Sequence, residues 1–257
     1  MSDRPRPPAA SVDPAAAVPD SRPALGIPAD ATLAGYDRWA EGYDATDNPM
    51  VAATAWALRT DPLDVAGRHL VELGSGTGRH AALALAGGAA RFTGVDGSTG
   101  MLAVATRACR DPRVHWHTAD VTATGLPAGC CDRLLVALVL EHLPDVAPLC
   151  REAARLAAPG AVLRVLEIHP DLIASGTGAH FVRDGVEHRF TSFAHPVATL
   201  VAALAAAGFP VANRREVVAD GELLAAVPRL AKHRGRRVLV DLTAHRGPFP
   251  PPVTPAG

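Results

Sequence analysis

The sequence lacks the features that define several large classes of protein. Lys and Arg together number 25 against 26 Asp and Glu, so no excess of positive charge favours nucleic acid or an anionic membrane as a partner. No uninterrupted apolar stretch approaches the roughly 18–20 residues that a membrane-spanning helix needs. The first 20 residues contain no apolar signal-peptide core. We therefore expect a cytoplasmic protein without a nucleic-acid or membrane partner.

Cysteine is also scarce, and it is not arranged as in a zinc site. None of the four cysteines forms a C-x-x-C pair; they are Cys109, Cys130, Cys131 and Cys150. Scattered cysteines of this kind favour reduced thiols with structural roles. Because the histidines show no i, i+4 ligand pair and no cysteine accompanies them, no metal is expected.

Large apolar residues are few at both ends of the chain. Residues 1–30 are dominated by Pro and Ala, which cannot bury enough surface to offset the entropy lost on ordering. Residues 247–257 are Pro-rich as well. We predict a disordered tail over 1–30, one folded domain over 31–246 and an extended tail over 247–257.

Between these tails, strand-like and helix-like patterns alternate. Short apolar runs predict seven strands, at 69–73, 91–96, 114–120, 131–140, 161–168, 211–218 and 236–245. The last two strands have little between them and are expected to pair as an antiparallel edge. The alternation predicts an α/β fold with a Rossmann-like, doubly wound seven-stranded sheet, mostly parallel, whose last strand is antiparallel.

The stretch "HLVELGSGTGRH", residues 69–80, places three glycines where the first strand should turn into a helix. Gly74, Gly76 and Gly78 permit dihedral angles that other residues avoid, and they let a ligand approach the backbone. The helix that follows would offer free N–H groups to an anionic group. The spacing is neither the G-x-G-x-x-G dinucleotide fingerprint nor a P-loop. Taken alone, it leaves a plain tight turn and a cofactor site equally open.

Acidic residues stand on the first three strands, close to this turn. Asp96 ends the second strand, where an acidic side chain can accept hydrogen bonds from ribose hydroxyls. Asp120 follows the third strand, in position to meet an adenine edge, and Glu72 lies inside the first. Three carboxylates around one small site disfavour a pyrophosphate and suit a nucleoside that carries a cationic centre.

Four successive stretches resemble the motifs of class I S-adenosylmethionine-dependent methyltransferases: "VELGSGTG", "GVDGSTGML", "TADVTATGLP" and "CDRLLVALVLEHLPD". They are similar in particular to the small-molecule branch related to quinone-biosynthesis methyltransferases. The order and spacing of the motifs match over about residues 36–210. The resemblance implies that the glycine turn holds S-adenosylmethionine.

The resemblance also implies which residues hold this cofactor. Glu72 and the three glycines match the first motif, around the methionine portion and the ribose. Asp96 matches the acidic ribose ligand, and Met101 an apolar residue near the adenine, although simple core packing explains a methionine equally well. Asp120 and Val121 match the adenine-recognition position.

The segment "YDRWAEGYDATDNPM" resembles the N-terminal part that closes over the cofactor in this branch, and residues 31–60 are predicted to form a helical cap. Tyr36, Trp39 and Tyr43 fall on one helical face. Tyr36 and Tyr43 could bind the cofactor, because aromatic faces attract a sulfonium cation. They could equally pack the helix onto the domain. These N-terminal helices could also supply a homodimer contact.

Residues 168–195 form an insert after the fifth strand, and we interpret this insert as a substrate lid. Ligands of open α/β sheets bind outside the carboxyl ends of the strands, where this insert begins. A histidine there could remove a proton from the acceptor, since its ordinary pKa lies near the working pH. His169 and His142 are the leading candidates and His180 is the third, with a structural role as the alternative for each.

The sequence therefore predicts an enzyme that transfers a methyl group from S-adenosylmethionine to an O, N or C atom of a small organic molecule. The composition, rich in Ala, Arg, Pro and Gly, is typical of proteins encoded by GC-rich bacterial genomes. Such an origin favours a specialised metabolite as the acceptor. The main alternative is a protein of the same fold that binds this cofactor and catalyses a non-methylating cyclisation or elimination. A nicotinamide-dependent oxidoreductase and a non-catalytic binding protein are weaker alternatives.

Overall fold

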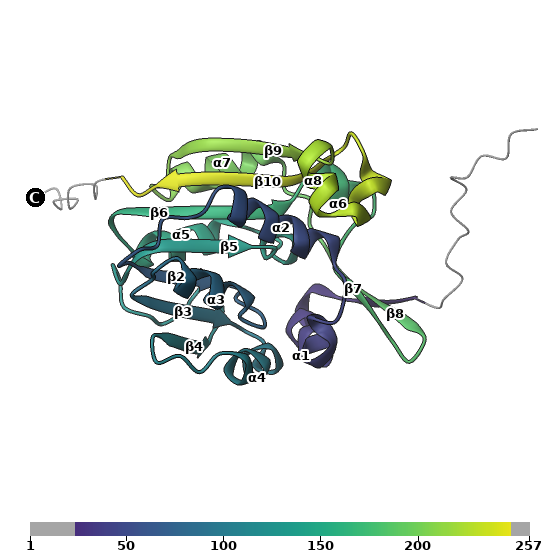
Figure 1. The fold of residues 1–257 in the computed structure, drawn as a ribbon, viewed down its shortest axis with the longest axis horizontal. Coiled ribbons are helices and arrows are strands. Elements are labelled where there is room, and N and C mark those ends of the chain that lie inside the picture. The colour runs from purple at the N-terminus through teal and green to yellow at the C-terminus, as the bar shows by residue number, and fades with distance from the viewer. Residues whose placement is uncertain (1–23, 248–257) are drawn as a thin grey trace, which may run out of the picture.

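The computed structural model describes residues 24–247, and its larger sheet has the strand order β4-β3-β2-β5-β6-β10-β9 (Figure 1). The strands from β2 to β6 pair in parallel, whereas β10 runs antiparallel to both β6 and β9. The predicted seven-stranded sheet with an antiparallel last strand is confirmed. Its strands are β2 (His69–Leu73), β3 (Arg91–Asp96), β4 (Val114–Thr118), β5 (Cys131–Ala137), β6 (Ala157–Ile168), β9 (Val211–Val218) and β10 (Arg237–His245).

Helices cover both faces of this sheet, as a doubly wound fold requires (Figure 1). Buried side chains of α5 and α7 form one core with the sheet, and those of α2, α3 and α8 form a second core on the opposite face. α4 packs against β4 and β3. The helices are α2 (Pro49–Thr60), α3 (Arg79–Ala86), α4 (Thr99–Ala108), α5 (Ala147–Leu156), α7 (Val197–Ala206) and α8 (Gly221–Ala226).

A smaller sheet with the order β1-β8-β7 lies beside helix α1 (Thr32–Tyr43) (Figure 1). It is on the side of the molecule where the parallel strands of the large sheet have their carboxyl ends. The insert after β6 contains the short helix α6 (Pro170–Ala174) and the hairpin of β7 (His180–Arg183) and β8 (Val186–Phe190). The remaining strand, β1 (Ala24–Ile27), pairs in parallel with β8. The predicted lid is thus a hairpin extended by a strand from the N-terminal part of the chain.

Strand β1 corrects the predicted boundary of the N-terminal tail. The sequence predicts a disordered tail that includes residues 24–30, but the structure has β1 and the start of a 3-10 helix at Ala29–Ala31 there. Their order comes from backbone pairing with β8, a partner that is distant in the sequence and that no local pattern reveals. The rest of both predicted tails, residues 1–23 and 248–257, lies outside the described residues.

The connection between the last two strands also differs from the prediction. Helix α8 and a 3-10 helix, η3 (Pro228–His233), occupy a stretch that was expected to contain little structure. Leu223, Leu224 and Leu230 of this connection are buried in the core that α2 also joins. Each helix is so short that its apolar residues show no complete period in the sequence.

Carboxylates on and after α1 fix this helix over the carboxyl ends of the parallel strands. Asp37 accepts hydrogen bonds at its Oδ1 from the Ser98 hydroxyl at 2.6 Å and from the Gly100 N–H at 2.8 Å, at the start of α4. Asp44 accepts one at 2.8 Å from the Thr77 hydroxyl in the glycine turn. The helix is thereby tied to the two loops that bound the site described next.

Candidate active site

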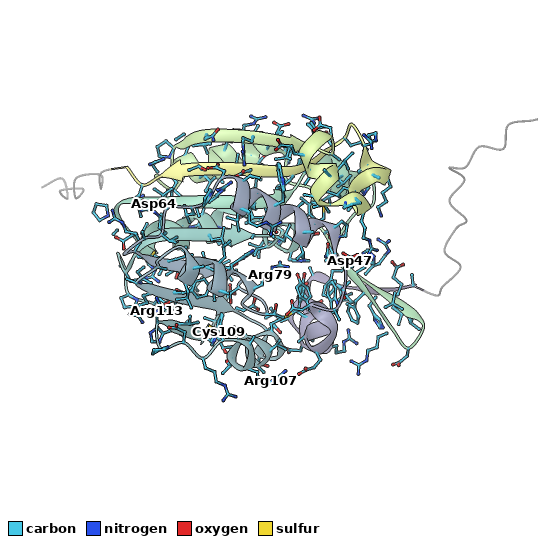
Figure 2. All side chains as sticks on the ribbon, viewed as in Figure 1. Asp47, Asp64, Arg79, Arg107, Cys109 and Arg113 are labelled. Atoms are coloured by element: carbon cyan, nitrogen blue, oxygen red, sulfur yellow. The ribbon has the colours of Figure 1, made fainter. Side chains whose placement is uncertain are left out.

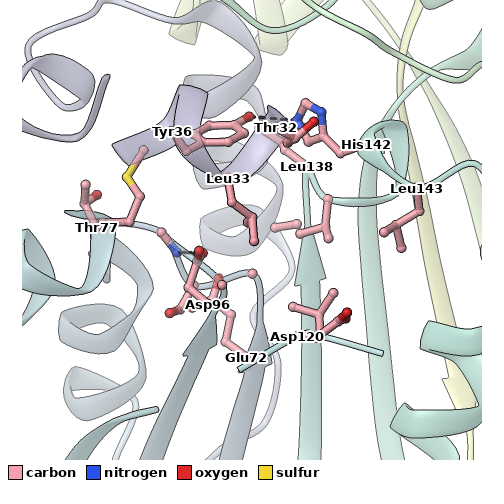
Figure 3. Close-up of a pocket in the computed structure, with 18 of the residues that line it drawn as sticks. Thr32, Leu33, Tyr36, Glu72, Thr77, Asp96, Asp120, Leu138, His142 and Leu143 are labelled. Carbon is pink, nitrogen blue, oxygen red and sulfur yellow. Dashed lines mark hydrogen bonds between the residues drawn. The ribbon is translucent and has the colours of Figure 1, made fainter. Parts of the chain in front are cut away.

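A cavity of about 460 Å³ lies under α1, at the carboxyl ends of β2, β3 and β5. Figure 3 shows Glu72 and Asp96 on one side of it, Asp120 on another, and Tyr36 and His142 across from them. Of the residues predicted to bind the cofactor, all except Gly78 line this cavity: Tyr36, Tyr43, Glu72, Gly74, Gly76, Asp96, Met101, Asp120 and Val121.

The three glycines of the turn share a positive φ angle but differ in the space around them. All have positive φ angles, of 79° at Gly74, 53° at Gly76 and 77° at Gly78. A Cβ at Gly74 would lie 2.2 Å from Val139, and one at Gly78 would lie 2.2 Å from the Trp116 ring. Next to Gly76 there is open space. Gly76 therefore forms a cradle on the cavity wall, while Gly78 caps α3 and contacts the protein instead.

This difference predicts opposite consequences for two matched substitutions. Gly78→Ala combines the strain of a left-handed residue with a clash against Trp116, which should lower the free energy of unfolding by about 2–4 kcal/mol. Gly76→Ala carries the strain alone, about 1–2 kcal/mol, but places a methyl group in the cavity. Thermal unfolding and calorimetric titration with S-adenosylmethionine should show Gly78→Ala as the less stable protein and Gly76→Ala as the weaker binder. The reverse order would contradict these assignments.

The carboxylate of Asp96 links the turn to the end of β3. Its Oδ2 accepts a hydrogen bond from the Gly76 N–H and its Oδ1 one from the Ser98 N–H, each at 2.8 Å. Burial raises the pKa of Asp96, and these two N–H groups oppose the rise. Each oxygen retains acceptor capacity toward the cavity. Asp120 lies in a more exposed turn, where its Oδ1 accepts from the Thr122 N–H and hydroxyl at 2.7 Å.

Glu72 lines the cavity with a carboxyl group of which only one oxygen has a partner within the part of the chain that the structure describes. Its side chain is 1% exposed, and its Oε1 lies 2.6 Å from Nδ1 of His80. Oε2 is buried without a hydrogen-bond partner among the described residues. A buried carboxylate oxygen that lacks a partner is costly, so a donor or cation supplied by a ligand fits this place. His80 was missed in the sequence, where nothing links it to Glu72.

The aromatic face of α1 both packs the helix and lines the cavity. The ring of Tyr36 stacks on Phe190 at 4.6 Å between centroids, and its hydroxyl lies 2.7 Å from Nε2 of His142. Burial, followed by nearby negative charges, raises the pKa of Tyr36 well above its usual value. The guanidinium of Arg79, the first residue of α3, sits 5.8 Å from the Tyr43 ring centroid; Arg79 is labelled in Figure 2. The two alternatives posed for these tyrosines are therefore compatible.

The three candidate histidines lie in different places. His142 lines the cavity, and burial lowers its pKa, which keeps the ring neutral near pH 7. His169 is 2% exposed and lines neither this cavity nor the second one described below; its Nδ1 accepts from the Asp171 N–H and caps α6, and its Nε2 lies 3.2 Å from Glu216. Its proposed role as a base is therefore corrected to a structural one. His180 is exposed on β7 and lines the second cavity.

A second cavity of about 340 Å³ lies beside the first, between α1, the ends of β5 and β6, the hairpin and η3. The two cavities share Tyr36, Tyr43 and Leu138 in their walls. The insert that we interpret as a substrate lid supplies part of this lining, whereas the part that comes from η3 was not predicted. The further residues that line it are Trp39, Thr46, Asp47, Asn48, Pro49, Met50, Glu141, Ile168, Thr177, Gly178, Ala179, His180, Arg229, Lys232 and His233.

Leu138, in the shared wall, has a backbone conformation that its side chain disfavours. Its φ is 58°, in the left-handed region. The buried Glu167 holds the turn that follows, since its Oε1 accepts hydrogen bonds from the N–H groups of Val139 at 2.7 Å and Leu140 at 2.9 Å. The turn after β5 is thus fixed by a side chain from β6, at the boundary between the two cavities.

Comparison with known proteins agrees with this geometry. Residues 71–165 match a family model described as a methyltransferase domain. An uncharacterised methyltransferase of Emericella nidulans is 30% identical over 80% of this chain and 86% of its own length. A trans-aconitate 2-methyltransferase of an Azoarcus species is 40% identical over 40% of each chain. A solved S-adenosylmethionine-dependent methyltransferase from Mesorhizobium loti superposes with a TM-score of 0.65 and 26% identity, covering 76% of this chain and 98% of that one.

The fold and the cavity define an enzyme of the S-adenosylmethionine-dependent transferase class. The chain belongs to the methyltransferase family, and S-adenosylmethionine is its cofactor. Within residues 24–247, no helix is long and apolar enough to cross a membrane. Over the same residues, no group of three or more His, Cys, Asp and Glu side chains is arranged to hold a metal ion.

Proposed function

We propose that the protein transfers the methyl group of S-adenosylmethionine to an O, N or C atom of a small organic molecule that binds in the second cavity. The observation that carries this proposal is the wall that both cavities share, formed by Tyr36, Tyr43 and Leu138. Methyl transfer requires the acceptor atom and the methyl carbon to meet in line, and two adjoining cavities provide such an approach.

Residues of the first cavity would hold the cofactor, which supplies an electrophilic methyl group on a sulfonium sulfur. Asp96 offers acceptor oxygens for the ribose hydroxyls, and Gly76 leaves room for the ligand beside the backbone. The carboxylate of Glu72 and the faces of Tyr36 and Tyr43 offer negative charge to a cation. Asp120 and Val121, which also line this cavity, would contact the adenine.

His142 and Tyr36 together would remove the proton of a hydroxyl or amine acceptor. Tyr36 lines both cavities, whereas His142 lines the first. The Tyr36 hydroxyl can pass its proton to Nε2 of His142 at 2.7 Å while taking the proton of the acceptor. Closure of α1 over the site would exclude water from this exchange.

A pair of histidine substitutions tests this role. His142→Gln should lower the rate of methyl transfer by about 10²- to 10⁴-fold, the usual contribution of a general base, without a matching loss of cofactor affinity. His169→Gln removes the cap of α6 and should leave the rate unchanged while lowering the melting temperature. An unchanged rate in His142→Gln would show that this ring takes no proton.

We propose the acceptor only as a class, a small organic molecule. The trans-aconitate 2-methyltransferase named above acts on a small organic acid, which supports a small molecule rather than a macromolecule. A specialised metabolite as acceptor, a cytoplasmic location and a homodimer through the N-terminal helices stay predictions from the sequence. The absence of nucleic-acid and membrane partners stays one as well.

Incubation with methyl-labelled S-adenosylmethionine and pools of small organic molecules tests the proposed function. We expect label in one small-molecule product and S-adenosylhomocysteine in equal amount, and neither with Asp96→Ala at limiting cofactor. A product formed without S-adenosylhomocysteine would instead favour the non-methylating cyclisation or elimination. Label in protein or nucleic acid alone would contradict the proposal.

A further inference from the structure

We propose that the second cavity recognises an acceptor with an anionic group, a carboxylate or a phosphate, which Lys232 binds at the open end of the cavity. This inference rests on the proposed function, because it names the chemical class of the acceptor. It comes from the distribution of charge in the cavity wall. The open end is the part lined by Arg229 and Lys232, which are both exposed, and its charge differs from that of the end next to Tyr36.

The open end carries more positive charge than the protein itself neutralises. Arg229, Lys232 and His233 of η3 line the cavity there. Arg229 is neutralised by Asp47, a second lining residue, at 2.7 Å. Lys232 is exposed and forms no ion pair with any residue in the described range 24–247. One cation that faces the cavity is thus left for a ligand.

The neighbouring basic residues are already engaged elsewhere or lie outside the cavity. Arg237 forms ion pairs with Asp171 and Glu216, and Arg236 donates to the Ser175 hydroxyl at 2.8 Å. Arg234 belongs to the basic stretch of residues 229–237, which also contains Lys232, but it does not line the cavity. Of these neighbours, only Lys232 and His233 combine a place on the wall with capacity for an anion.

His233 adds a polar atom beside Lys232. Its Nδ1 is buried without a hydrogen-bond partner among the residues that the structure describes. Burial, followed by the positive charges of Lys232 and Arg236, lowers its pKa. A neutral imidazole can still donate one N–H to an anionic oxygen, so His233 adds a side chain with hydrogen-bonding capacity to the charge of Lys232.

The end of the cavity next to Tyr36 has the opposite character. Glu141 is 3% exposed there, and its Oε2 accepts from the Ser192 hydroxyl at 2.7 Å. An anionic group placed beside this carboxylate would be repelled, whereas a hydroxyl or amine could donate to it or to Tyr36. Trp39, Met50 and Ile168 also line the cavity and make part of its wall apolar. The cavity therefore suits an organic acid whose nucleophilic hydroxyl or amine is separated from its anionic group.

Binding of matched probes to the full chain, saturated with S-adenosylhomocysteine, tests this assignment. The cofactor product fills the first cavity, so the probes report on the second. The pairs are 4-hydroxybenzoate with 4-hydroxybenzamide, and 4-hydroxyphenyl phosphate with hydroquinone, followed by ligand-observed NMR titration. We expect the anionic member of a pair to bind more tightly, with the carboxylate and phosphate arms deciding which anion is preferred.

Two substitutions on the same basic stretch locate the effect. Lys232→Met should weaken the anionic probe by about three- to tenfold, as expected for a partly exposed charge-assisted contact. Arg234→Met, which removes the same charge outside the cavity, should change the affinity by less than about twofold through screened, long-range attraction. Neither variant should change the affinity for S-adenosylhomocysteine.

The inference is overturned if the uncharged probes bind as well as the anions, if no probe binds, or if both variants weaken binding equally. Failure of the proposed function looks different. In that case the protein binds neither S-adenosylhomocysteine nor S-adenosylmethionine, or transfers no label to any small molecule, whatever the probes do.

Discussion

Replacement of Asp96 by alanine should lower the affinity for S-adenosylmethionine by about ten- to a hundredfold, the equivalent of losing charge-assisted hydrogen bonds of about 1.5–3 kcal/mol. Two contributions add here. The variant removes the acceptor oxygens intended for the ribose, and it frees the N–H groups of Gly76 and Ser98, which Asp96 holds at 2.8 Å. The cradle at Gly76 loses its support together with the ligand contact.

Calorimetric titration of purified protein measures this effect, with Asp111→Ala as the control. Asp111 is an acidic residue whose carboxylate pairs with Arg113 and lies outside the cavity. Its loss changes the net charge equally and should leave the affinity within about twofold. An Asp96→Ala protein that binds as tightly as the wild type would show that this carboxylate does not hold the cofactor.

Stability should fall as the pH rises from about 5 to 8, because of Glu167. Burial raises the pKa of this carboxyl from 4.5 to about 8, although the N–H groups of Leu140 and Val139 oppose the rise. The folded protein keeps most of this proton until the pH approaches about 8, whereas the unfolded chain releases it near pH 4.5. The folded state thus binds more protons, and the free energy of unfolding decreases as pH rises through the window. Ionising this one group should remove on the order of 4 kcal/mol.

Glu167→Gln isolates this contribution. The amide oxygen can still accept from Val139 and Leu140, and the side chain has no charge to lose. Denaturant unfolding should give both proteins similar stability at pH 5, within about 1 kcal/mol, and a more stable variant at pH 8.5, by about 3 kcal/mol. The exposed Glu222→Gln serves as the control and should show no such divergence. Parallel curves for Glu167→Gln and the wild type would mean that Glu167 is already ionised at pH 5.

The large sheet and most of the residues that line the first cavity could be predicted from the sequence, and the reason is local. Each strand of the sheet is a short apolar run, and Gly76, Asp96 and Asp120 follow directly from the ends of such runs. Parallel strands bring their carboxyl ends to one edge, so residues that follow successive strands meet in space. Positions that depend on this rule therefore line the same cavity.

Features that depend on distant contacts could not be predicted. β1 is ordered by pairing with β8, which is distant in the sequence. His80 contacts Glu72 because α3 places its side chain beside β2. The left-handed Leu138 depends on Glu167, a residue of the next strand. His169 follows the end of β6, much as Asp96 stands at the end of β3, yet the side chain of His169 caps α6. The rule places a residue at the edge of the sheet but does not set the direction of its side chain.

The most direct test of the account is a crystal structure with S-adenosylhomocysteine and an acceptor identified by label transfer. We expect the adenosine between Asp96 and Asp120, and the sulfur facing the wall of Tyr36 and Leu138, with the acceptor on the other side of that wall. A ligand whose sulfur faces away from the second cavity, or an acceptor bound outside it, would contradict the central claim that methyl transfer occurs between these two cavities.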